Sequence, residues 1–282
     1  MVGILDAHSS SDKESIRTIY LEDGKKIYVA ESNTRAMFNS TNEMVDWAWW
    51  TWNPVTGCWH GCPYCYARDI ANRFYETKFE PTFHPNRLAA PKNMKPMTKE
   101  RIKNEASKRR VRIEDAYIFA KNVFTCSMAD LFGKWVPDDW IISVFDSVKE
   151  SPEWNFLFLT KFPQRLQEIN DKLGGFPNNV WVGTTVDTQS RVSLAERSFR
   201  HINAKVKWLS IEPMLEPLEF HSLEMFDLIA IGGQSRTSKE PEFQPEWIWV
   251  EALLNQARES NTSVYFKENL RARPKELPWQ NV

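Results

Sequence analysis

The second half of the chain alternates between short apolar runs and longer segments with helical spacing. The apolar runs include NFLFLT, VWVGTTV, VKWLSIE, DLIAIGG and SVYFKEN, and segments such as PDDWIISVFDSVKES and PEWIWVEALLNQARES separate them. Continuous apolar strands separated by helices are typical of βαβ units in a parallel sheet whose two faces are both covered. The pattern therefore predicts an α/β fold.

Two further strands are predicted upstream, in WAWWTWNP, which ends at Pro54, and in YIFAKNVFTCSMAD, which ends near Ser127. They bring the predicted total to about seven strands after residue 46. No Gly-x-Gly-x-x-Gly follows the first of them, so the dinucleotide-binding fingerprint of doubly wound sheets is absent. We expect a partial TIM-like (β/α)6 parallel barrel rather than a doubly wound sheet.

The first 46 residues are expected to form a separate extension. TIYLEDGKKIYVAES has two alternating runs around Asp23-Gly24, which is a β-hairpin signal. The barrel domain is expected over 47–282, with a long basic insert at about 76–116. Within the insert, Thr98 is expected to cap a helix that runs to Arg112.

Polar residues gather where the predicted strands end. In α/β barrels the chemistry collects at the carboxyl ends of the strands, although single polar residues there can also serve as helix caps and turns. Six successive polar strand ends favour an active-site face. These residues are Ser127 and Asp130, Thr160 and Lys161, Thr184 and Thr185, Ser210 and Glu212, Gly232 to Gln234, and Lys267 and Glu268.

Composition narrows the class of protein. Apolar residues make up 42% and charged residues 26%, which is typical of a globular protein, and a net charge of −1 gives no overall attraction to nucleic acid or membranes. No apolar run is long enough to span a bilayer, and no signal peptide is visible, so a cytoplasmic protein without a membrane partner is expected. Thirteen Trp residues indicate a large aromatic core, with a pocket for a flat ligand as the alternative.

Three of the four cysteines lie in one short stretch, TWNPVTGCWHGCPYCYARD. Cys58, Cys62 and Cys65 have the spacing C-x3-C-x2-C, and thiolates at such spacing bind soft metals. A structural zinc site would need a fourth ligand, for which His60, His84 and Cys126 are the candidates. A disulfide would leave one thiol unpaired. A [4Fe–4S] cluster held by three cysteines leaves one iron open, as catalytic metal sites do.

This spacing, with Tyr64 before the last cysteine and a position after the first barrel strand, resembles the radical S-adenosylmethionine superfamily. The finer resemblance is to the phage gene-product 37/68-like family. It rests on TWNPVTGC…CYA, HPNRLAAP, SMADLFGKWVP, FLTKFPQR, VWVGTTVD, WLSIEPM, IAIGGQS and VYFKEN, across about residues 47 to 270. That family usually has Glu where Gln234 stands. The N-terminal hairpin and the basic stretch look like additions to its pattern.

The resemblance implies a radical enzyme. Cys58, Cys62 and Cys65 would hold three irons of a [4Fe–4S] cluster, and the open iron would bind S-adenosylmethionine. An electron from a donor such as flavodoxin or ferredoxin would split the sulfonium, and the 5′-deoxyadenosyl radical would abstract a hydrogen atom from a substrate. The expected cofactor-binding residues are Tyr64, Ser127, Asp130, Thr160, Gly232 and Gly233, and the expected catalytic residues are Cys126, Lys161 and Glu212.

The sequence indicates the substrate less clearly than it indicates the cofactor. Nine Lys or Arg residues between Lys92 and Arg112 have the charge density of a phosphate-binding segment, although a solvated helix gives the same pattern. Three hypotheses follow: a radical enzyme that modifies or repairs nucleic acid, a radical enzyme that acts on a peptide or small metabolite, and a non-catalytic metal-cluster protein that binds nucleic acid.

Overall fold

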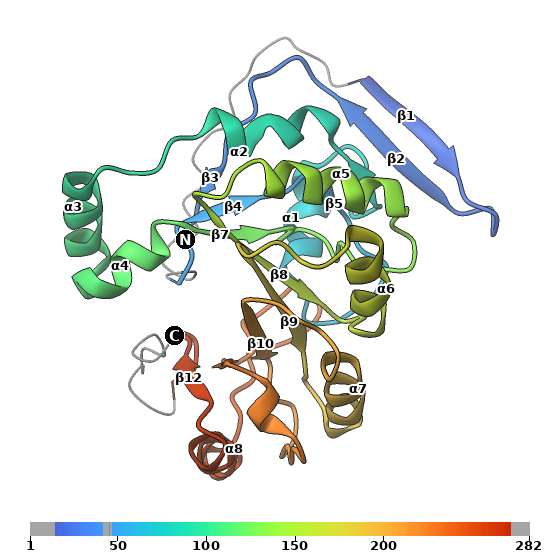
Figure 1. Ribbon diagram of the computed structural model, residues 1–282. Helices are drawn as coiled ribbons and strands as arrows, with labels where there is room; N and C mark the ends of the chain where they lie inside the picture. Colours follow the sequence, from blue (N-terminus) through green and yellow to red (C-terminus); the bar gives the residue numbers. More distant parts are fainter. Residues whose placement is uncertain (1–14, 42–44, 46, 272–282) are drawn as a thin grey trace.

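A computed structural model describes residues 15–41, 45 and 47–271 (Figure 1). It shows an α/β fold with a mostly parallel β-sheet at its centre. The sheet has eight strands in the order β12-β11-β10-β9-β8-β7-β4-β3, and all neighbours from β4 to β12 are parallel, whereas β3 is antiparallel to β4. The strand order follows the chain without the reversal that a doubly wound sheet has. The strands are β3 (Asn39–Ser40), β4 (Trp50–Trp52), β7 (Asn122–Thr125), β8 (Asn155–Thr160), β9 (Val180–Thr185), β10 (Val206–Ile211), β11 (Leu228–Ile231) and β12 (Ser263–Phe266).

Four helices cover one face of this sheet. They bury apolar side chains against alternate strand residues such as Phe156, Val182 and Ile229, which are fully buried. Figure 1 shows three of them, α5, α6 and α7, along the right-hand side of the sheet. Each helix joins two neighbouring parallel strands, as the sequence predicts. The four are α5 (Asp138–Lys149), α6 (Gln164–Leu173), α7 (Gln189–Phe199) and α8 (Trp247–Glu259).

Large aromatic side chains pack on the opposite face of the sheet. Trp181, Trp208 and Tyr265 come from β9, β10 and β12 and belong to one cluster with Trp47, whose ring centroid lies 5.8 Å from that of Trp208. The ring of Trp208 lies so close to Gly183 that a Cβ there would be 2.5 Å from it. Most of the described Trp side chains are buried in this way, so the aromatic core predicted from composition is confirmed.

The predicted N-terminal hairpin forms, but it is tied to the rest of the fold. Strands β1 (Ser15–Tyr20) and β2 (Lys26–Glu31) pair around a turn in which Gly24 has a φ of 78°, and the hairpin projects at the upper right of Figure 1. Strand β2 also pairs with β6 (Thr82–Phe83), which pairs with β5 (Val55–Thr56). The extension therefore shares a second sheet, β1-β2-β6-β5, with the two residues that lead into the cysteine stretch.

The basic connection is largely helical. Helix α3 (Lys99–Arg109) begins after Thr98, whose side chain accepts a hydrogen bond from the Arg101 amide as predicted. Helix α4 (Ile113–Phe119) ends just before β7, and the Phe119 carbonyl accepts from the Trp49 amide at the start of β4. The basic segment therefore lies at the amino ends of β4 and β7. The other short elements are η1 (Pro85–Ala89), α2 (Ala90–Asn93) and η2 (Leu223–Met225).

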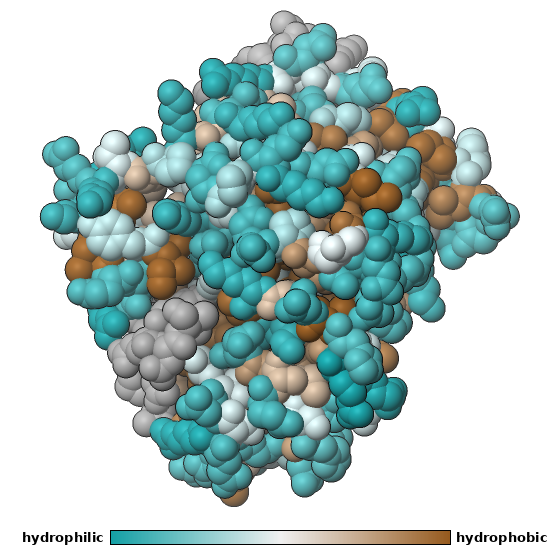
Figure 2. All heavy atoms as spheres, in the orientation of Figure 1, coloured by the Kyte–Doolittle hydropathy of each residue, from teal (hydrophilic) through white to brown (hydrophobic). Residues whose placement is uncertain are grey.

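Hydrophilic side chains cover most of the face seen in Figure 2. Among the described residues, every helix is too short or too polar to pass through a bilayer.

Candidate functional site

The cysteine loop lies at the carboxyl end of the parallel sheet, where β4 and β7 lead into their loops. The Gly57 amide donates to the Met128 carbonyl at 2.8 Å, and the Cys58 amide donates to the Phe79 carbonyl at 3.0 Å. Helix α1 (Tyr66–Phe74) begins directly after Cys65, which is its N-cap residue. The loop is thus held between β7 and the second sheet, on the side of the fold where the polar strand ends lie.

All three thiols of this loop are half-buried. Burial, and then the charge of Asp130, raises the pKa of Cys58. Burial also raises the pKa of Cys65, while the backbone amides of Arg68 and Ala67, at the start of α1, oppose that rise. Across residues 15–41, 45 and 47–271, no three His, Cys, Asp or Glu side chains converge as the ligands of one metal ion do. Of the candidate fourth ligands, His84 is buried and hydrogen-bonded to Thr56 at 3.0 Å.

Tyr64, in the cysteine loop, joins two charged side chains from the strand ends. Its hydroxyl bonds to the carboxylate of Asp187 and accepts from the ammonium of Lys161. The Lys161 ammonium is 2.8 Å from Asp187 Oδ2, and Arg191 Nε is 2.9 Å from Oδ1. Burial, and then the charge of Asp187, raises the pKa of Tyr64, so the phenol keeps its proton and donates to the carboxylate. We call these four residues the Lys161 network.

The pH dependence of the free energy of unfolding tests the ion pairs of the Lys161 network. Burial alone would raise the pKa of Asp187, but Lys161, Tyr64 and Arg191 together hold it below 3.8. Because the folded-state pKa is lowered, the carboxylate stabilises the fold above its ordinary pKa, and this contribution disappears as the pH falls through the lowered value. We expect Asp187→Asn to reduce the free energy of unfolding by about 3 kcal/mol at pH 7, because two cations lose their counter-charge.

Urea titrations at pH 7 and below pH 4 measure this effect. The difference between wild type and variant should shrink in acid, and a difference that stays constant would contradict the assignment. The control Asp171→Asn changes an exposed carboxylate on α6 and should shift stability by less than about 0.5 kcal/mol.

His60 and Asp130 connect the cysteine loop to β8. The imidazole Nε2 is 2.7 Å from Asp130 Oδ2, and the same carboxylate accepts from the Thr160 hydroxyl at 2.7 Å and from the Lys161 amide at 2.8 Å. The His60 ring stacks on Phe162 with centroids 4.6 Å apart. The structure therefore brings Asp130, Thr160 and Lys161 together, and it makes His60 part of the site as a partner of Asp130, whereas the sequence offers it only as a candidate fourth zinc ligand.

Glu212 and Lys267, which directly follow β10 and β12, form a second charged pair, and Asn269 donates to Glu212 at 2.9 Å. A Cβ on Gly232 would lie 2.8 Å from Asn269 Oδ1 and 3.2 Å from the Glu212 carboxyl carbon. A Cβ on Gly233 would lie 2.3 Å from Gln244 Nε2. A Cβ on Gly233 would also lie 2.9 Å from the Asn269 backbone carbonyl oxygen, so close approach of backbone favours glycine there, whereas only side-chain atoms crowd Gly232. All of these atoms belong to this chain.

Three other expected positions lie near the ends of β7 and β11. The hydroxyls of Ser127 and Thr51 are 2.7 Å apart, on the sheet face opposite the covering helices. Cys126 lies in the helix-side core, where burial raises its pKa to about 12. Gln234 donates its amide to the Pro241 carbonyl at 2.6 Å, a bond that an ionised glutamate could not make.

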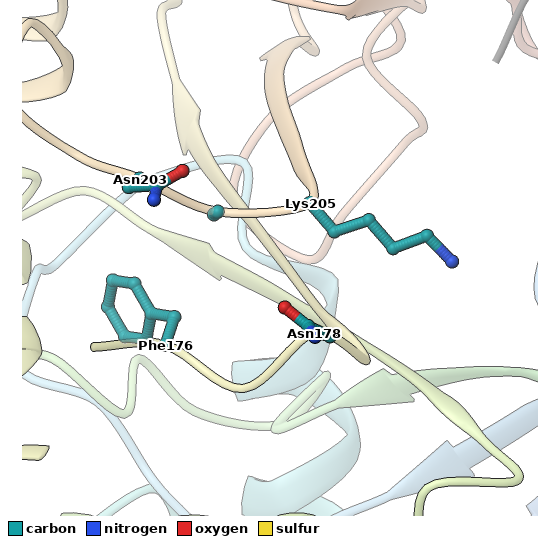
Figure 3. Close-up of a pocket in the computed structure, with 5 residues that line it drawn as sticks. Phe176, Asn178, Asn203 and Lys205 are labelled. Carbon is teal, nitrogen blue, oxygen red and sulfur yellow. The ribbon is translucent and has the colours of Figure 1, made fainter. Parts of the chain in front are cut away.

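The basic segment and one pocket lie at the other end of the sheet. Helix α3 packs against α4 at the amino ends of β4 and β7, so its cations are not beside the cysteine loop. A pocket of 340 Å³ is lined by Phe176, Asn178, Asn203, Ala204 and Lys205, in the loops that precede β9 and β10 (Figure 3). Neither feature shares residues with the Lys161 network.

Sequence reasoning missed Asp187, Arg191 and Asn269. Asp187 directly follows the run VWVGTTV, so the strand-end rule could have included it. Arg191 lies four residues after Asp187, at the start of α7, so its pairing with Asp187 is local in the chain. Asn269 carried no such signal, because only the fold brings the segment after β12 to Glu212.

Comparison with known protein families identifies the family of this chain. The family model described as "Protein of unknown function (DUF5131)" matches residues 42–276, which is most of the chain. The chain therefore belongs to this family. No curated protein and no solved structure matches it.

Proposed function

We propose that this member of the DUF5131 family is a radical S-adenosylmethionine enzyme with a [4Fe–4S] cluster on Cys58, Cys62 and Cys65. One observation carries the proposal: three half-buried thiols share one loop at the carboxyl end of a parallel α/β sheet. Tyr64 bonds this loop to Lys161 and Asp187, after β8 and β9, and His60 bonds it to Asp130, after β7. In α/β barrels this end of the sheet holds the active site.

The finer fold assignment belongs to the same proposal. We infer a partial TIM-like (β/α)6 barrel, because the parallel strands follow chain order and α5 to α8 pack on a single face. A barrel is wound in this way, with one layer of helices outside and side chains inside. The aromatic side chains of Trp181, Trp208 and Tyr265 would then fill the barrel interior beneath the site.

The chemistry of the donor set fits an iron–sulfur cluster. Each thiolate of such a cluster binds its own iron, so the three ligands need not converge on one point. Cys65 stands at the N-terminus of α1, where the helix dipole and free amides favour a thiolate. The burial that raises the thiol pKa values here is offset when a metal binds, because the metal displaces the proton.

When bound, the cluster would reductively cleave S-adenosylmethionine and so supply the radical that abstracts hydrogen from the substrate. The chain's own residues would orient and enclose the reactants. The ammonium of Lys161 and the carboxylates of Asp187 and Glu212 offer fixed charges to the polar ends of an amino-acid-containing cofactor. Tyr64 holds the loop to these charges, and the Trp181–Trp208–Tyr265 layer excludes water from below.

We further propose an electron donor such as flavodoxin or ferredoxin as a partner, because reductive cleavage needs one external electron. Nucleic acid is the substrate class that we favour, since five exposed cations of the basic segment form no ion pair within the described part of the chain. They are Lys95, Lys99, Arg101, Lys103 and Arg110.

Anaerobic reconstitution tests the proposal. Protein supplied with iron, sulfide, dithionite and S-adenosylmethionine should bind iron and release 5′-deoxyadenosine and methionine. Protein that takes up one zinc ion per chain instead, or that binds a cluster but never cleaves the cofactor, would contradict it.

A further inference from the structure

A large groove runs beside the cysteine loop. Its volume is 1280 Å³, and the turn of the N-terminal hairpin, residues 21–26, forms one wall. Residues 134–138 and Arg165 form the other wall, and Trp59, Trp135 and Phe162 contribute aromatic rings between them. The groove therefore joins the N-terminal extension to the loop that carries the three cysteines.

The aromatic rings of the groove belong to segments that also build the site. Trp59 directly follows Cys58, and Phe162 directly follows Lys161. The centroid of the His60 imidazole lies 5.2 Å from that of Trp135 and 4.6 Å from that of Phe162, and the imidazole bonds to Asp130. A ligand in the groove would thus touch residues one peptide bond away from a proposed iron ligand and from the Lys161 network.

The groove pairs aromatic faces with ammonium groups. Lys25 Nζ lies 5.4 Å from the Trp59 ring, and Lys134 Nζ lies 5.4 Å from the Phe162 ring. Both rings are half-buried, so each keeps an accessible surface. Aromatic platforms beside cations are what single-stranded nucleic acids need, since bases stack on the rings and phosphates pair with the ammonium groups.

The acidic side chains of the groove are mostly engaged. Asp23 pairs with Lys25, Asp138 pairs with Arg165, and Glu80 accepts from Trp59 Nε1 at 2.8 Å. Lys26 and Lys134 are exposed, and neither has an acidic partner in the ranges that the structure describes. Of the cations in the lining, these two lysines are therefore the ones free to meet phosphates, while Glu22 is an exposed carboxylate that forms no ion pair with the described residues.

We propose that this groove holds a single-stranded nucleic acid as the substrate strand. A base adjacent to the segment held in the groove would then reach the cysteine loop and the Lys161 network. The proposal rests on the proposed function for its chemistry, but not for its binding. It places the substrate at the carboxyl end of the sheet, whereas the basic helix α3 lies at the amino end and would not position a reacting base.

Fluorescence anisotropy on the full chain tests the groove. The probes are fluorescein-labelled 12-nucleotide oligothymidylate and oligouridylate and a duplex of the same length, at two salt concentrations. We expect the single strands to bind more tightly than the duplex. The double variant Lys26→Glu with Lys134→Glu should weaken single-strand binding about tenfold and lower the salt slope by about 1.5. The variant Lys99→Glu with Lys103→Glu on α3 should weaken single strands and duplex alike, because those cations supply only general attraction to phosphates. The matched control Lys149→Glu with Lys205→Glu changes two exposed lysines outside both the groove and the basic segment and should leave affinity and salt slope unchanged.

The reverse pattern, with loss on α3 and none in the groove, would overturn the proposal, as would equal affinity for the duplex or no binding of either single strand. Photocrosslinking of a 5-iodouracil strand to unmodified protein provides a readout without mutation. Crosslinks at Trp59 or Phe162 support the groove, and crosslinks confined to α3 refute it. Because binding is measured without cofactor or reductant, a failure here is distinct from a failure to form 5′-deoxyadenosine.

Discussion

Replacement of Cys62 by alanine should abolish iron binding and the release of 5′-deoxyadenosine. Two thiolates remain on the loop, and three are needed to hold a [4Fe–4S] cluster that keeps one iron open. Cys62 is half-buried and belongs to a loop held by backbone bonds at Gly57 and Cys58, so the fold itself should survive. Iron analysis, visible absorption and product chromatography on anaerobically reconstituted protein measure the loss.

The fourth cysteine is the matched control. Cys126 is buried in the helix-side core, so Cys126→Ala should cost about 1 kcal/mol of stability but should retain iron and cofactor cleavage. If Cys62→Ala keeps its iron, or if Cys126→Ala loses it, the ligand assignment is wrong. If Cys126→Ala still cleaves the cofactor but no longer converts the substrate, the expected catalytic role of Cys126 gains support.

The second large effect is expected at Gly57, immediately before the first cysteine. Its φ is 84°, and a Cβ there would lie 2.1 Å from the Glu80 carbonyl oxygen and 2.7 Å from the Pro81 nitrogen. These atoms are backbone and lead into β6, which pairs with β5, so they cannot move without breaking the second sheet. Gly57→Ala should therefore lower the free energy of unfolding by about 4 kcal/mol and displace Cys58 enough to prevent cluster assembly.

Gly61 offers a control within the same loop. Its φ is 73°, but a Cβ there meets nothing within 4 Å. Gly61→Ala should carry only the left-handed backbone cost of about 1 kcal/mol and should still take up iron. Denaturant titration and iron content of the two variants give the comparison. Equal losses of stability and iron in both variants would mean that the close packing of Gly57 against the Glu80 and Pro81 backbone does not position the loop.

The long elements could be predicted because each has its own signal. NFLFLT and VWVGTTV are continuous apolar runs, and the structure forms β8 and β9 over those residues. Pro137 and Gly174 mark helix boundaries, and the structure begins α5 and ends α6 at them. Strands β5 and β6, of two residues each, have no periodicity to detect, so the link between the hairpin and the cysteine loop was not predictable.

The candidate site also has a part that the sequence predicts and a part that it does not. The polar strand ends were predicted, and the structure brings Asp130, Thr160 and Lys161 into contact, and Glu212 and Lys267 into a separate pair. The position of the basic helix was not predictable, because nothing in its composition tells which end of the sheet it covers. Only its packing on α4, at the amino ends of β4 and β7, places it away from the cysteines.

The sequence by itself determined the order of strands and helices, the polar residues at strand ends and the spacing of the three thiols, because these depend on residues near one another in the chain. The tertiary structure decided that His60 bonds to Asp130, that Tyr64 bonds to Lys161 and Asp187, and that the hairpin turn forms a wall of the groove. These contacts depend on strand register and on the packing of distant segments, which local composition does not encode.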